Sequence, residues 1–179
     1  NGNSRTGLNV NSLYLIIKEL LDLPILYLSR YIIKNKSEYY RLIQSVRDNG
    51  NWEEWILFVL KGVEETAEET IVLVKQIKVL MQEYKEKMKI VMGKQYSHEL
   101  LNNLFKHPYT KIDFVMQDLN VSRITATGYL NKLVSNGLLE KLKLGHSNFY
   151  LNTALSQILI EHSPKANKKN KKIESISKI

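Results

Sequence analysis

The chain has 179 residues, of which 44% are hydrophobic and 25% are charged, proportions that indicate a folded protein. It contains no Cys, which excludes disulfides, thiolate metal ligands and Cys nucleophiles, and its four His are scattered without metal-ligand spacing. Eight Gly and three Pro favour helices over a turn-rich β architecture. No apolar run approaches the roughly 20 residues of a membrane-spanning helix, and no secretory signal pattern is present, so we expect a cytoplasmic protein without a membrane partner.

The net charge of +8 is distributed unevenly along the chain. Residues 1–92 carry a net +1, residues 93–160 carry +3, and residues 161–179 carry +4. A basic C-terminal region suggests a polyanion such as DNA as a partner, although a basic tail is often only solubilising.

Helical periodicity dominates the first half of the chain. It predicts helices over residues 8–21, 25–33 and 37–49, the third capped by Ser37 and ended by Gly50. From residue 52 to residue 92, apolar residues recur every three or four positions, which predicts a helix of roughly 60 Å at about 1.5 Å per residue. Two alternatives account for this length: two helices that meet near Gly62, or one helix that packs against a partner chain.

The pattern changes from residue 97 onward. Short helices are expected at 97–105 and 112–119, joined by a His-Pro-Tyr turn, and a further helix runs from a Ser122 cap to Gly137. Two strands are predicted, at 138–144 and 148–151. This order resembles a winged helix-turn-helix domain, in which the second helix of the pair enters the DNA major groove. An apolar face should pack the third helix on the second; its residues are Val115, Leu119, Val121, Ala126, Leu130 and Leu133.

The opposite face of that third helix holds the candidate DNA-binding residues. They are Arg123, Thr125, Thr127, Asn131 and Lys132. Arginine and lysine can reach phosphates or base edges, and asparagine can read adenine. Gly128 lies on the same face and offers no contact, so a role in protein interaction or dimerisation is the competing interpretation.

The opening of the chain has the character of a phosphate-binding loop. Small residues and one arginine lead directly into the predicted helix at residue 8; they are Gly2, Asn3, Ser4, Arg5 and Gly7. Backbone N–H groups, the positive end of a helix and a guanidinium fork all favour an anion there. Such clusters are also common as plain helix-entry loops.

This stretch resembles the second half of the Fic family motif, His-x-Phe-x-(Asp/Glu)-Gly-Asn-Gly-Arg-x-x-Arg. The similarity continues through later segments, which are Leu13-Tyr14-Leu15-Ile16, residues 23–29, Tyr39-Tyr40-Arg41-Leu42 and Trp52-Glu53-Glu54-Trp55. These resemble the helices of Fic proteins with a C-terminal winged helix. The resemblance implies transfer of AMP from ATP, with Mg²⁺, to a protein hydroxyl of Ser, Thr or Tyr.

The resemblance is incomplete at the motif itself. The catalytic His and the Phe fall before residue 1, so no catalytic residue is assigned within this chain. Asn1 replaces the acidic Mg²⁺ ligand and is a poorer ligand for a hard cation. Ser4 replaces a Gly and Leu8 replaces the last Arg, whereas Arg5 matches the first. This polypeptide is therefore not expected to catalyse the transfer unaided, whether it is a piece of a longer protein or a decayed relative.

The predicted fold is mainly α. Residues 1–92 form the remnant of a Fic-like helical bundle with a long connecting helix, residues 93–160 an α+β winged helix, and residues 161–179 a disordered basic tail. The leading functional hypothesis is the C-terminal portion of a Fic-like protein adenylyltransferase. The alternatives are a non-enzymatic DNA-binding regulator and a pure interaction scaffold, with a homodimer as a further expectation.

Overall fold

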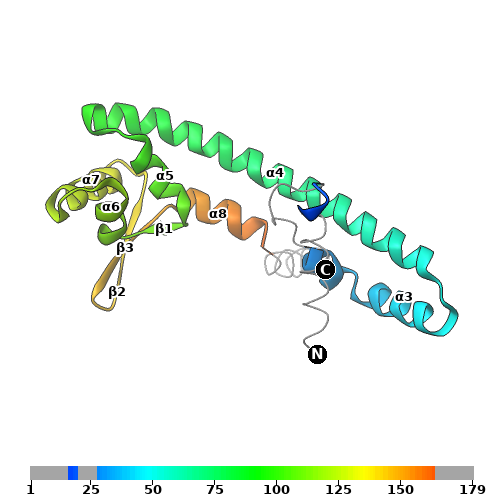
Figure 1. Ribbon diagram of the computed structural model, residues 1–179. Coiled ribbons are helices and arrows are strands. Elements are labelled where there is room, and N and C mark those ends of the chain that lie inside the picture. Colours follow the sequence, from blue (N-terminus) through cyan, green and yellow to red (C-terminus); the bar gives the residue numbers. More distant parts are fainter. Residues whose placement is uncertain (1–15, 20–27, 164–179) are drawn as a thin grey trace, which may run out of the picture. The chain divides into compact units, whose positions relative to one another are not determined.

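The computed structural model describes residues 16–19 and 28–163 (Figure 1). The chain divides into two compact units, Asn1–Val72 and Leu73–Ile179. Helix α4 (Trp52–Met92) belongs to both units and is continuous over 41 residues. The alternative of two helices meeting near Gly62 is therefore wrong, and a single long helix is correct. In the described ranges, no helix is long and apolar enough to cross a membrane.

The first unit joins α2 (Leu28–Lys34) and α3 (Lys36–Asn49) to the first part of α4. Gly62 permits close contact with α2, because a Cβ atom at this position would lie 2.6 Å from Tyr31 Cδ1 and 2.9 Å from Leu28 Cδ1. Aromatic rings of Tyr31, Tyr39, Trp55 and Phe58 pack on one another, with the Tyr31 and Phe58 centroids 5.0 Å apart. Gly62 therefore marks a packing contact, not a break in the helix.

Two boundaries in this unit differ from the sequence prediction. The third helix begins at Lys36 with Asn35 as N-cap, so Ser37 lies inside the helix instead of capping it. The Asn35 amide donates back to the Tyr31 carbonyl oxygen at 3.0 Å, which ties the turn to α2. Of the helix predicted over 8–21, only residues 16–19 are described. Helical backbone there ends at Ile17 and Glu19 has a φ of 57°, so the helix does not continue unbroken to residue 21.

The C-terminal end of α3 follows the prediction. Gly50 has a φ of 67°, a left-handed conformation that glycine adopts without the strain of a Cβ atom, and its N–H donates to the Val46 carbonyl. Helix α4 starts two residues later.

The described part of the second unit, up to residue 163, contains a short helical turn and four further helices with three strands. In chain order the elements are η1 (Gly93–Gln95), α5 (His98–Lys106), β1 (Tyr109–Thr110), α6 (Ile112–Leu119), α7 (Arg123–Ser135), β2 (Glu140–Leu144), β3 (Ser147–Leu151) and α8 (Thr153–Glu161). The predicted helices at 97–105, 112–119 and after Ser122 are confirmed, as is the β2–β3 hairpin, with ends shifted by one or two residues. Strand β1 and helix α8 were not predicted.

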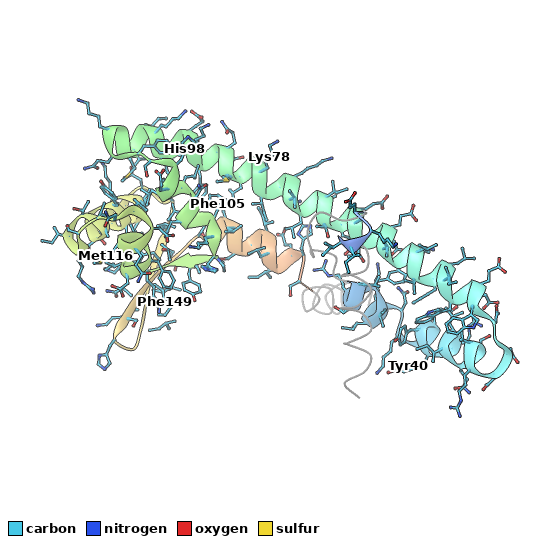
Figure 2. The ribbon with its side chains drawn as sticks, in the orientation of Figure 1. Tyr40, Lys78, His98, Phe105, Met116 and Phe149 are labelled. Carbon is cyan, nitrogen blue, oxygen red and sulfur yellow. The ribbon has the colours of Figure 1, made fainter. Side chains whose placement is uncertain are left out.

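The strands form an antiparallel sheet of order β1-β3-β2. Thr110 pairs with Tyr150 and Lys141 pairs with Tyr150 on the other side, so these residues share one face of the sheet. Thr110 and Tyr150 are buried, which makes this the core face. Tyr109, Leu142 and Phe149 alternate onto the opposite, partly exposed face (Figure 2 labels Phe149).

One core holds the second unit together. The apolar face predicted for the helix pair is confirmed: Val115, Ala126, Leu130 and Leu133 are buried, with Leu119 and Val121 packed against them. The last turns of α4 contribute Tyr84, Met88 and Met92 to the same core. The compact unit that begins at Leu73 therefore includes these α4 side chains in its interior.

Candidate recognition helix and cleft

Helix α7 is held in place by an N-cap and by its buried face. The Ser122 hydroxyl accepts a hydrogen bond from the Thr125 N–H at 3.2 Å, as the sequence predicted. Asn120, in a left-handed conformation with a φ of 52°, closes α6 just before. The short turn between these two caps fixes α7 against α6, so its outer face is set by the core packing beneath.

The structure places all five predicted DNA-binding residues on α7, but several already have partners within the chain. Arg123 forms an ion pair with Asp113 at 3.1 Å, and Lys132 donates to the Gln95 side chain at 3.3 Å. The Thr127 hydroxyl donates to the Arg123 carbonyl, one turn back in the helix. These contacts reduce the charge and the donors that the helix presents to an outside partner.

Thr125 and Asn131 complete the set. The Thr125 hydroxyl lies 3.0 Å from the Ser122 hydroxyl, so it helps to close the start of the helix. Asn131 is exposed, and its side chain makes no hydrogen bond within the ranges that the structure describes. It is thus the member of the predicted set that is most open to an outside partner.

The most exposed residues along the outer face of α7 are uncharged. Ile124 is 86% exposed, and a Cβ atom added at Gly128, one turn further, would have no heavy atom within 4 Å. Asn131 continues this line. An exposed isoleucine beside an open glycine is suited to contact with an apolar group, whereas a DNA-reading helix relies on cations and hydrogen-bond donors.

A buried hydrogen-bond network anchors α4 to the rest of the second unit. The Tyr84 hydroxyl lies 2.9 Å from the Leu138 carbonyl oxygen and 3.0 Å from Asn152 Oδ1. Asn152, only 1% exposed, also caps α8 by accepting from the Leu155 N–H, and its amide donates to the Leu104 carbonyl. Burial and the charge of Glu83 raise the pKa of Tyr84, which keeps the hydroxyl neutral. This network connects α4, α5, α8 and the segment before β2.

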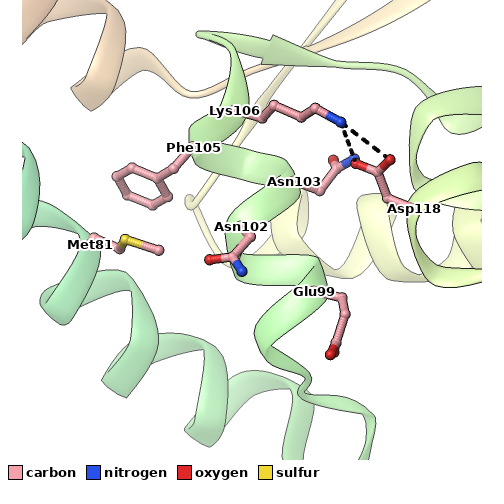
Figure 3. Close-up of a pocket in the computed structure, with 7 residues that line it drawn as sticks. All are labelled: Met81, Glu99, Asn102, Asn103, Phe105, Lys106 and Asp118. Carbon is pink, nitrogen blue, oxygen red and sulfur yellow. Dashed lines mark hydrogen bonds and ion pairs between the residues drawn. The ribbon is translucent and has the colours of Figure 1, made fainter. Parts of the chain in front are cut away.

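A cleft of about 530 Å³ lies where α4, α5 and α6 meet (Figure 3). Lys106 reaches across to Asp118 at 3.5 Å, and the Asn103 amide donates to the same carboxylate at 2.9 Å. Met81 and Phe105 form an apolar wall away from the carboxylate (Figure 3). The other lining residues are Glu99 and Asn102.

A buried hydrogen bond orients the polar side chains of the cleft. Asn103 is buried and its Oδ1 accepts from the Thr110 hydroxyl at 2.6 Å, so its amide is oriented toward Asp118. The hydrogen bond from Asn103, and then the charge of Lys106, hold the pKa of Asp118 below its ordinary value. The carboxylate is therefore ionised at neutral pH. Sequence reasoning missed this group, because its members meet only when α5 packs on α6.

Asp118 is expected to make the stability of the second unit depend on pH. Because its pKa is lowered in the folded state, its contribution is full above the unfolded pKa near 4 and is lost as pH falls through the folded value. Asp118→Asn should therefore be less stable than wild type at pH 7, and the difference should shrink steadily below about pH 4. Urea titrations followed by circular dichroism at several pH values measure this; a difference that stays constant with pH would contradict it.

No metal centre is evident in the part of the chain that the structure describes. Among residues 16–19 and 28–163, no group of three or more His, Cys, Asp or Glu side chains could hold a metal ion. The residues predicted to bind phosphate or Mg²⁺ lie outside the described residues; they are Asn1, Gly2, Asn3, Ser4, Arg5 and Gly7.

The fold of the second unit defines a small α+β domain attached to the end of a long helix. Residues 80–155 match the family model described as "Protein adenylyltransferase SoFic-like, C-terminal domain". This part of the chain is accordingly a SoFic-like C-terminal domain of the Fic family. The matched segment starts within α4, at the turns that enter the core, and ends early in α8. The matched domain belongs to the family that the opening residues resemble.

Proposed function

We propose that this chain is the C-terminal portion of a Fic-like protein adenylyltransferase, which transfers AMP from ATP to a hydroxyl group of a protein substrate. The observation that carries the proposal is the family match over residues 80–155. The continuous helix α4 begins at Trp52, in one of the later segments that resemble Fic proteins, and ends in this domain. Since the chain contains no motif His, catalysis needs a His supplied from outside these residues.

Within that protein the second unit serves as a non-catalytic recognition module. Its buried Tyr84–Asn152 network holds the domain to the last turns of α4, so its outer surfaces have a defined orientation relative to that helix end. Those surfaces include the neutral line of α7 and the mixed polar and apolar cleft beside Asp118. Both are suited to protein partners, in keeping with an enzyme that modifies proteins.

The loop at residues 2–7 contributes phosphate contacts, with Arg5 as the charged member. Arg5→Ala should weaken the binding of ATP with Mg²⁺ at least tenfold, because a bidentate guanidinium contact to phosphate is lost. Isothermal titration of the full chain measures this, with Lys18→Ala as the charge-matched control that should leave affinity unchanged. Equal affinity of Arg5→Ala and wild type would contradict the role given to the loop.

DNA binding is the second candidate function, favoured by the exposure of Arg123, Asn131 and Lys132 on one helix. If it holds, duplex DNA should be bound with strong salt dependence, and Arg123→Ala with Lys132→Ala should reduce the salt slope. Fluorescence anisotropy tests it. Binding that is insensitive to both substitutions would assign any residual affinity to the basic C-terminal residues and exclude α7 as a reader.

A further inference from the structure

A second cavity shares one wall with the cleft beside Asp118. It has a volume of about 190 Å³ and is formed by α5, α6 and the turn that follows α5. We call it the α5–α6 pocket; its lining residues are Asn103, Lys106, His107, Phe114, Gln117 and Asp118. Figure 3 shows the wall that both cavities share, which is made of Asn103, Lys106 and Asp118. The volume is below the roughly 300–1,000 Å³ of pockets for drug-sized ligands, so the pocket is suited to a single ring system.

Planar side chains line one part of the α5–α6 pocket. Phe114 comes from α6, and His107 is the residue that ends α5. Tyr109 extends this group, because its ring centroid lies 6.3 Å from that of His107, at an interplanar angle of 26°, and 6.4 Å from that of Phe114. His107 and Tyr109 are exposed, and Phe114 is half-buried. Accessible aromatic side chains of this kind bind nucleobases, since every base has a π face that stacks on them.

The polar wall of the α5–α6 pocket offers hydrogen-bond acceptors. The Asp118 carboxylate is ionised at neutral pH and can only accept. It takes one hydrogen bond from the Asn103 amide at 2.9 Å, and Lys106 Nζ lies 3.5 Å from both of its oxygens. Because 31% of the Asp118 side chain is exposed, lone pairs remain for a ligand. Gln117 is exposed, and its side chain makes no hydrogen bond within the described ranges, so its amide can donate to the same ligand.

Guanine is the nucleobase that matches this wall. Its Watson–Crick edge carries two adjacent donors, N1–H and the exocyclic N2 amine, and the acceptor O6. A carboxylate such as Asp118 can accept from both donors together, as it does from a guanidinium. The Gln117 amide can donate to O6. Adenine has an acceptor at N1 beside its amine, so it offers the carboxylate only one donor.

Positive charge lies beside the aromatic rings. Lys111 Nζ is 5.9 Å from the centroid of Phe114 and 4.3 Å from that of Phe149. In the part of the chain that the structure describes, Lys111 forms no ion pair, whereas the carboxylate of Asp113, two residues later, is paired with Arg123. The charge of Lys111 can therefore pair with a phosphate attached to the base.

We propose that the α5–α6 pocket binds the guanine base of a nucleotide. The base packs on Phe114 and His107, its edge meets Asp118 and Gln117, and its phosphate pairs with Lys111. The site is independent of the proposed AMP transfer, since all its residues belong to the second unit and none to the loop at residues 2–7. A free guanosine phosphate and a guanosine within a single strand of RNA or DNA offer the same chemistry.

Titration of the full chain with GMP, followed by ¹H–¹⁵N amide chemical shifts, tests the proposal. GMP should shift resonances within residues 103–118 in a saturable way. AMP should bind there about tenfold more weakly, because one of the two hydrogen bonds to the carboxylate is lost. Inosine monophosphate, which lacks the exocyclic amine, should also bind more weakly than GMP. No saturable shift within residues 103–118, or equal affinities for GMP and AMP, would overturn the proposal.

Two variants separate the base contact from the phosphate contact. Asp118→Asn should weaken GMP binding about tenfold, because an amide cannot accept from both guanine donors. Asp113→Asn is the matched control: this exposed carboxylate of α6 lies outside the pocket, so GMP affinity should be unchanged. Lys111→Gln gives a readout that does not depend on the folding of Asp118→Asn. It should lower the affinity for GMP and leave that for guanosine, which has no phosphate, the same; equal losses for both ligands would contradict the phosphate contact.

Oligonucleotides distinguish the two sources of guanosine. An oligouridine with one central guanosine, and its deoxy counterpart in oligothymidine, are titrated beside GMP. Tighter binding of either strand than of GMP assigns the pocket to single-stranded nucleic acid, and weaker binding of both assigns it to a free nucleotide. Arg5→Ala should leave GMP binding intact while it weakens ATP binding, so a failure of the nucleotide loop and a failure of this pocket are seen separately.

Discussion

Replacing Asn152 with alanine is expected to lower the free energy of unfolding of the second unit by about 3 kcal/mol. The substitution removes the N-cap of α8, which by itself is worth about 1 kcal/mol. It also leaves the buried Leu104 carbonyl without its donor and takes one acceptor from the Tyr84 hydroxyl. Unpaired buried polar groups cost about 1–3 kcal/mol each, so the network should dominate the loss.

Ser122→Ala is the matched control for this experiment. Ser122 caps α7 with the same side chain-to-backbone geometry but is exposed, so its loss should cost only about 1 kcal/mol. Tyr84→Phe provides a milder probe of the network if Asn152→Ala does not fold. Urea denaturation followed by circular dichroism gives the energies. Equal losses for Asn152→Ala and Ser122→Ala would show that the buried network adds nothing beyond the cap.

The same glycine-to-alanine substitution is expected to have opposite effects in two helices. Gly62→Ala should destabilise the first unit by about 1–2 kcal/mol, because the new Cβ atom overlaps with Tyr31 and Leu28 and outweighs the gain in helix propensity. Gly128→Ala should stabilise the second unit by about 1 kcal/mol, since nothing lies within 4 Å and only the propensity gain remains.

Two separate signals report these effects. Both tryptophans, Trp52 and Trp55, belong to the first unit, so their fluorescence follows the effect of Gly62→Ala in a urea titration. Hydrogen exchange of α7 amides follows Gly128→Ala in the second unit. A stabilised Gly62→Ala variant would mean that α2 can move away from α4 without cost, and the close contact would then not be a constraint.

Local patterns predicted the second unit well because its elements are short and clearly bounded. Ser122, as an N-cap residue, predicted the start of α7, and the apolar spacing from Val121 to Leu133 predicted the face that is buried. The missed elements gave weaker signals. Strand β1 has two residues and exists through its pairing with β3, and the start of α8 is marked in the sequence by the N-cap residue Asn152 alone.

In the candidate site too, local sequence patterns did not predict contacts between different elements. The five predicted residues of α7 are where the sequence placed them, yet the ion pair of Arg123 with Asp113 and the contact of Lys132 with Gln95 join residues from other elements. The cleft at Asp118 depends on Asn103 and Lys106, which come from another helix. Such groups cannot be read from spacing, because they form across helix contacts.

The sequence by itself determined the helical class, the helix pair with its hairpin and the resemblance to the Fic family. Each of these follows from local patterns: periodicity, caps, turn residues and a motif. Only the tertiary structure decided that Gly62 is a packing contact, that Tyr84 and Asn152 connect α4 to the domain, and which apolar residues of α4 remain exposed. The physical reason is that periodicity identifies apolar positions, whereas burial depends on which neighbouring helix reaches them.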